Sequence, residues 1–302
     1  MQIRRLITLT VVMTMFVLCL PAAASAEVVP GDVLTEVRRL GETIDALADR
    51  DVVASARIDV AGAQPREVWF QAREVWGLAD RLALEQTGTL GEPPLLPAQD
   101  IRPADVRAVV LAAQARLDRV AAARGVTTPP IGDPAPRTTT PTDVFAALLV
   151  AGERLVSLLA SPPDAGDAWR SATQCVILGG RLLAATGVER RIPDEGTPDA
   201  LDGPALKSLL VSLIDRTAAA VRARGHRVSD LTLRPGTAPD AALVVQVITW
   251  VESELRFLVL DQGGASGPDA WDPGVVELGE LAARLTVLDA QLSQLGDLKV
   301  AP

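Results

Sequence analysis

Eight stretches of this sequence carry apolar or small residues at alternating steps of four and three, a pattern that restricts the chain to packed helices. The first reads Val33, Val37, Leu40, Ile44 and Leu47. The others repeat this spacing from Val68, Val106, Val144, Ala168, Leu206, Val244 and Leu281. A mean spacing of 3.5 residues is typical of antiparallel bundles whose helices cross at about 20°. We therefore predict an all-α fold, an antiparallel helix bundle of about eight helices.

A phrase of the form Pro-x-acid-Val opens each of the first four stretches, beginning at Pro30, Pro65, Pro103 and Pro141. Proline costs no hydrogen bond in the first turn of a helix, and an acidic side chain there faces free backbone N–H groups and the positive end of the helix dipole. Thr140 is well placed to cap the fourth of these helices. The phrase thus predicts four helix starts.

The helices also recur as groups of three, about 100 residues apart. Trp69 corresponds to Trp169, and three further landmarks follow in the same order: Arg81-Leu82 with Arg181-Leu182, Thr87-Gly88 with Thr186-Gly187, and Ala123-Arg124-Gly125 with Ala223-Arg224-Gly225. This spacing predicts an internal three-helix repeat, with the seventh and eighth helices as a truncated third copy. We expect a first repeat over 27–135 and the second repeat plus the truncated copy over 136–302, as either two domains or one body.

Residues 1–26 have the layout of a secretory signal peptide. Arg4 and Arg5 precede an uncharged apolar run from Leu6 to Leu20, and small residues ending at Ala26 follow it. The run of about 15 residues is shorter than the roughly 20 of a membrane-spanning helix. We expect cleavage after Ala26 and a periplasmic or secreted protein with no stable membrane span, and an uncleaved anchor is the alternative.

Composition limits the chemistry of the chain. The formal net charge is −9, or −11 without residues 1–26, which disfavours nucleic acid as a partner. Cys175 is the one cysteine outside the signal segment, so no intrachain disulfide is expected, and His226 is the one histidine. The sequence has neither a Gly-x-Ser-x-Gly elbow nor a phosphate-binding Gly-x-x-x-x-Gly-Lys loop. We expect no catalytic residues, no cofactor and no metal.

Several residues still invite a functional interpretation. Cys175 lies on a buried stripe and is better explained as a core residue than as a nucleophile. His226 follows a helix end and is expected to be solvated, and Glu252 and Glu254 are expected to be surface charges because residues two apart on a helix diverge. The loop that holds Asp261, Asp269 and Asp272 could accommodate calcium, but its spacing does not match an EF-hand.

Trp69, Trp76 and Trp169 are the candidate ligand-lining residues. Trp69 and Trp76 are seven residues apart and share one helix face, and Trp169 stands at the equivalent position of the second repeat. They could line an apolar pocket between helices, although such residues more often fill the core.

The sequence favours a noncatalytic exported protein that acts as an interaction or scaffold module. We expect its partner to be another exported or envelope protein, and the oligomeric state stays open. A carrier or sensor domain for a small apolar ligand, with its site between the Trp-bearing helices, is the alternative. An unfamiliar carboxylate enzyme is a third possibility.

Overall fold

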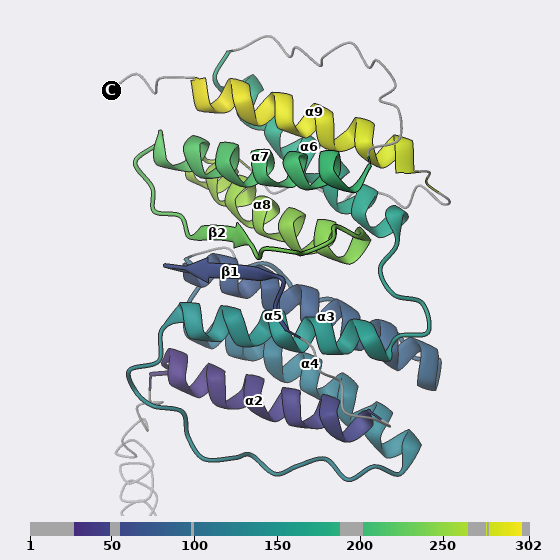
Figure 1. Ribbon diagram of the computed structural model, residues 1–302. Helices are drawn as coiled ribbons and strands as arrows, with labels where there is room; N and C mark the ends of the chain where they lie inside the picture. The colour runs from purple at the N-terminus through teal and green to yellow at the C-terminus, as the bar shows by residue number, and fades with distance from the viewer. Residues whose placement is uncertain are drawn as a thin grey trace, which may run out of the picture.

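A computed structural model describes residues 27–48, 55–97, 100–187, 202–264, 276 and 278–297. Within these ranges the chain forms eight helices and a two-stranded antiparallel ribbon (Figure 1). The helices are α2 (Pro30–Leu47), α3 (Pro65–Thr87), α4 (Pro103–Arg124), α5 (Pro141–Leu158), α6 (Ala165–Ala185), α7 (Gly203–Arg222), α8 (Ala241–Asp261) and α9 (Leu278–Asp297), and the strands are β1 (Ile58–Ala61) and β2 (Asp230–Leu233). The all-α prediction is confirmed, whereas the short ribbon was not predicted.

The predicted stripes form the core. Their residues are buried, apart from Leu158 and Leu206, which are half-buried near helix ends. Burying apolar area in this way is the main favourable contribution to folding. None of the helices in the described part of the chain combines the length and the apolar character needed to cross a membrane.

The helices pack in two groups of four. In the first group α2 and α3 each contact both α4 and α5, and in the second group α6 and α7 each contact both α8 and α9. The groups meet where α3 packs on α8 and where β1 pairs with β2 (Figure 1). The buried apolar residues of both groups form one continuous cluster, and α3, α8 and the ribbon join the two groups.

Helices within each group run parallel, which corrects the predicted antiparallel orientation. Arg107 of α4 donates to Glu36 of α2 at 2.9 Å, and seven residues further along both helices Gln114 donates to Thr43 at 3.0 Å. All four helix starts of the first group surround one small apolar hollow, which is lined by the prolines and valines of the four phrases: Pro30, Val33, Pro65, Val68, Pro103, Val106, Pro141 and Val144. A 3.5-residue spacing does not distinguish parallel from antiparallel neighbours.

Linker length explains these directions. Connections of 15 to 18 residues follow α2, α3, α4, α6, α7 and α8, and about 50 Å of extended chain is enough to return along a helix of about 30 Å. Only six residues, 159–164, connect α5 to α6. This short connection reverses the direction of the chain between the two groups. As a result α3 and α8 run antiparallel where the groups meet, so the predicted antiparallel packing occurs between the groups and not within them.

An acidic residue caps each helix start of the first group. The carboxylates of Asp32, Glu67, Asp105 and Asp143 accept hydrogen bonds of 2.6–2.9 Å from the backbone N–H groups three residues before them. The hydrogen bonds from Thr140 also lower the pKa of Asp143. Parallel helices bring four positive dipole ends together, and the four carboxylates offset this repulsion.

The predicted three-helix repeat is not confirmed. In the first copy α4 packs on α2 and α3, but its expected counterpart α7 packs on α8 and α9. Helix starts instead recur every 35 to 38 residues within each group. The division into 27–135 and 136–302 stays a prediction about folding units, although packing places α5 with α2 and α3. The signal peptide falls outside the described residues.

Candidate functional site

A cavity of about 420 Å³ lies at the junction between the two groups. It is bounded by the first turns of α3, by the linker between α3 and α4, and by the last turns of α8, with these lining residues: Pro65, Arg66, Phe70, Leu96, Pro97, Asp100, Ile101, Ser253, Arg256, Phe257, Leu260 and Asp261. Because the groups are antiparallel, the start of α3 meets the end of α8 at this point. The volume is within the ~300–1,000 Å³ typical of small-molecule sites.

The linker between α3 and α4 is positioned by a buried ion pair. Arg116 of α4 contacts Asp80 of α3 at 2.9 Å, and the backbone N–H of Gly91 donates to the same carboxylate at 2.8 Å. A Cβ atom at Gly91 would lie 1.3 Å from the Arg116 guanidinium, so any larger residue would displace this side chain from its place beside Asp80. We call this contact of Asp80 with Arg116 and Gly91 the clamp. It holds the linker that supplies Leu96 and Ile101 to the cavity.

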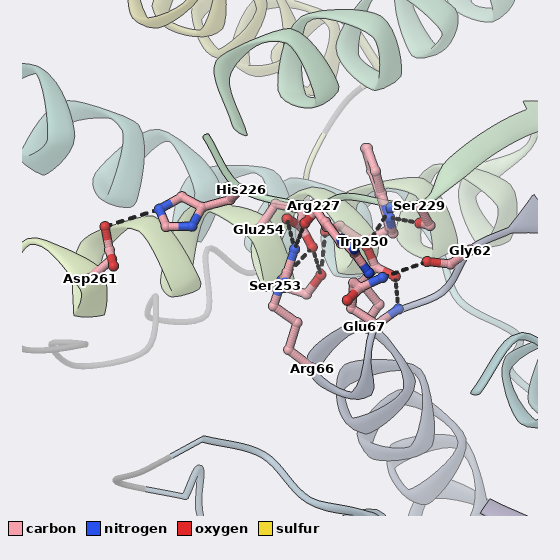
Figure 2. A network of polar contacts seen from close by, with 11 residues as sticks. Gly62, Arg66, Glu67, His226, Arg227, Ser229, Trp250, Ser253, Glu254 and Asp261 are labelled. Carbon is pink, nitrogen blue, oxygen red and sulfur yellow. Dashed lines mark hydrogen bonds and ion pairs between the residues drawn. The ribbon is translucent and has the colours of Figure 1, made fainter. Parts of the chain in front are cut away.

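Arg66 joins α3 to α8 beside the cavity (Figure 2). Its Nε and Nη2 donate to the two carboxylate oxygens of Glu254 at 2.9 and 2.8 Å, and Nη2 also donates to the carbonyl of Arg227. The guanidinium lies 4.2 Å from the ring centroid of Phe257. A bidentate pair combined with a cation–π contact fixes this side chain in one orientation.

Glu67 and Glu254 form a buried carboxyl pair, with exposed fractions of 1% and 0%. Glu67 accepts the backbone N–H groups of Gln64 at 2.6 Å and Ser229 at 3.0 Å. Burial raises the pKa of Glu254 to about 8; Glu67 adds to the rise, and Arg66 opposes it. With a pKa in this range, Glu254 holds its proton at neutral pH despite its contact with Arg66.

Trp250 completes the support of this pair from α8. Its indole N–H donates to the Ser229 hydroxyl at 2.9 Å, and the Ser229 backbone in turn donates to Glu67. The carboxyl oxygens of Glu67 thus receive donors from the protein itself, and neither Glu67 nor Glu254 lines the cavity. The arrangement is suited to joining two helices rather than to attacking a substrate.

Asp261 lines the cavity, and Figure 2 shows His226 reaching toward its carboxylate. The His226 Nε2 atom is 3.1 Å from an Asp261 carboxylate oxygen, and the imidazole packs edge-on against Phe257 with 4.8 Å between ring centroids. The His226 side chain is 26% exposed, so it is partly solvated and partly packed against Asp261 and Phe257. Asp269 and Asp272 fall outside the described residues.

Glu252 and Glu254 are not surface charges, which corrects the prediction from their spacing. Glu252 accepts a 2.7 Å hydrogen bond from Arg256, and both residues are buried between α8 and its neighbours. They do diverge as expected for residues two apart, because Glu254 pairs with Arg66 instead. The sequence could not show that α8 is enclosed on these faces as well.

A second perturbed acid lies where α3, α6 and α8 approach one another. Burial raises the pKa of Glu74 to about 7, and the negative charge of Asp167 adds to this rise while Arg73 opposes it. Arg81 of α3 pairs with Asp167 of α6 at 2.7 Å nearby. The junction between the groups is therefore rich in charge along much of α3.

Cys175 lies in the core, as expected. It is fully buried, its Sγ atom is 3.7 Å from the Ile248 carbonyl, and burial holds the pKa of its thiol well above the usual range. It does not line the cavity beside His226. The sulfur and the imidazole thus belong to different parts of the molecule.

The three tryptophans proposed from the sequence do not line this cavity. Trp69 and Trp76 are buried, and Trp69 packs edge-on against Phe70 with 5.1 Å between ring centroids. Trp169 is half-buried beneath Arg284 of α9, whose guanidinium is 4.9 Å from the ring centroid. A ligand site between the Trp-bearing helices stays a prediction.

In the part of the chain that the structure describes, no cluster of three or more His, Cys, Asp or Glu residues could hold a metal ion. Comparison with protein-family models, curated proteins and solved structures found no match.

Proposed function

We propose that this chain is a noncatalytic binding protein that holds a small amphipathic ligand in the cavity between α3 and α8. The cavity itself is the observation that carries the proposal. Phe70, Phe257 and Leu260 supply apolar surface, while Arg66 and Asp261 supply charged groups at fixed positions. Sites of this kind orient a ligand through a few polar groups and bind it mainly through apolar contact.

The surroundings favour binding over catalysis. The groups with raised pKa values, Glu74 and Glu254, lie outside the cavity lining, and Glu254 is engaged by Arg66. A general acid or base needs hydrogen-bond reach to its substrate. The predicted signal peptide indicates that this binding takes place in the periplasm or outside the cell.

A second candidate is docking with another exported or envelope protein. Leu90 and Leu95 of the linker between α3 and α4 are 70% and 89% exposed. These two exposed leucines flank Gly91, where the linker is fixed to Asp80, and are suited to contact with a partner surface. This candidate retains the interaction module that the sequence favours.

Native mass spectrometry of protein from an exported fraction tests the ligand proposal. Leu260→Trp fills the cavity from its rim, and Leu111→Trp is the matched control because Leu111 is similarly exposed (38% against 42%) on α4, away from this lining. We expect a bound small molecule on the wild type and the control but not on Leu260→Trp. Absence of a bound molecule on the wild type, or the same added mass on all three proteins, would contradict the proposal.

A further inference from the structure

We infer that the ligand is an amphipathic cation, with an apolar body inside the cavity and a positively charged group at its rim beside Asp100 and Asp261. This inference rests on the proposed function and deepens it. The cavity lining contains two arginines and two aspartates, which differ in how far the protein already pairs them.

The two arginines of the lining have partners within the protein. Arg66 pairs with Glu254 at 2.8 Å, donates to the Arg227 carbonyl and lies over the Phe257 ring, so its guanidinium already has three partners. Arg256 pairs with Glu252 at 2.7 Å, and its side chain is only 5% exposed. An anionic ligand would compete with these carboxylates for each guanidinium, which disfavours an anion.

The two carboxylates of the lining are in a different situation. Asp100 is exposed, and the Asp261 side chain is 46% exposed with the ring of His226 as its neighbour. His226 offsets Asp261 only when its imidazole is protonated. The charged groups of the lining that solvent reaches most are therefore the two carboxylates, since Arg66 and Arg256 are only 15% and 5% exposed, and the chain as a whole has a net charge of −9. Both favour the approach of a cation.

The apolar part of the lining determines the rest of the ligand. Phe70, Leu96, Ile101, Phe257 and Leu260 come from three different segments and converge on one space. Apolar surface is buried at a gain of about 25 cal/mol per Å². An alkyl or aryl body joined to an ammonium group matches this combination of apolar surface and rim charge.

Three probes with the same tail test the inference by calorimetric titration into the full mature chain: n-octylammonium, 1-octanol and octanoate. We expect n-octylammonium to bind about 3- to 10-fold more tightly than 1-octanol, as two solvent-exposed carboxylates allow, and octanoate to bind most weakly. The preference for the ammonium should decrease as salt is added.

A double variant connects the preference to the rim. Asp100→Asn with Asp261→Asn should remove the ammonium preference and leave 1-octanol affinity unchanged, whereas Asp118→Asn with Asp133→Asn, two acids outside the lining, should change neither. Equal affinity for the ammonium and the alcohol, or tighter binding of octanoate, would overturn the inference and leave the binding function standing. Binding of none of the three probes would overturn both.

Discussion

Arg66 of α3 donates two hydrogen bonds to the buried carboxylate of Glu254 on α8, and this ion pair fastens the two groups of four helices beside the cavity. Glu67 lies against the same carboxylate. Three residues at the junction therefore share two acidic groups and one permanent positive charge. The stability of the junction and its response to pH follow from this arrangement.

Arg66→Met should be strongly destabilising at pH 8, by about 3–5 kcal/mol, because it leaves two buried carboxyl groups without their cation. The loss should be smaller at pH 5, where Glu254 is protonated and needs no cation. Glu254→Gln keeps the shape and should cost less than Arg66→Met at pH 8. Urea unfolding at the two pH values measures both variants, and an equal loss for Arg66→Met at pH 5 and pH 8 would contradict the raised pKa of Glu254.

The wild type should lose stability as pH rises from about 5 to 9. The pKa values of Glu74 and Glu254 in the folded state, about 7 and about 8, exceed the ordinary value of 4.5, so the folded state binds more protons than the unfolded state in this window. Stability then falls with pH, most steeply between pH 5 and 7, and levels off above pH 9.

At acid pH the stability of the protein should also fall as the pH is lowered. Asp143 and Asp167 have lowered pKa values, so their contribution is lost as pH falls below about 4. Thermal unfolding between pH 3 and pH 9 should therefore give maximum stability near pH 5. A melting temperature that rises steadily from pH 5 to pH 9 would be inconsistent with two protonated acids at the junction.

Much of the fold could be predicted because its determinants are local. The proline and the acid of each phrase set a helix start, and α2, α3, α4 and α5 begin at the predicted Pro30, Pro65, Pro103 and Pro141. The 3.5-residue stripes identified the core for the same reason. Helix direction depends on how long linkers return along the bundle, and the pairing of β1 with β2 joins residues far apart in sequence.

The site could not be predicted in this way. Arg66 and Phe257 are ordinary residues of two helices, separated by almost 200 positions, and they meet only because the groups pack antiparallel. The prediction that Glu254 lies on the surface is wrong for a related reason, because α8 is buried on more faces than its apolar stripe indicates. The run of apolar residues through the first half of α8 was the one available signal of such enclosure.

Cys175 should react slowly with a bulky thiol reagent in the native protein and rapidly after denaturation, because burial raises the pKa of its thiol and blocks access. Cys175→Ala should cost on the order of 1 kcal/mol. Cys175→Val should be tolerated better than Ala if the site accepts one more methyl group. Fast labelling of the native protein would show that the sulfur is not in the core.

Gly91→Ala should weaken the clamp that holds the linker, because the new methyl group would overlap the Arg116 guanidinium. We expect a loss of about 1–3 kcal/mol, the range for overpacking a filled site. Gly132→Ala is the matched control, since nothing lies within 4 Å of a Cβ atom at that position. Denaturant midpoints that are equal for the two variants would mean that the linker is not held at Gly91.

Hydrogen exchange with and without saturating n-octylammonium tests the central claim most directly, because it locates the ligand without a mutation. The account predicts added protection in residues 65–70 of α3 and 253–261 of α8, which line the cavity, and none in residues 109–113 of α4. Protection centred on Trp76 and Trp169, with no change in the α3 and α8 segments, would contradict it.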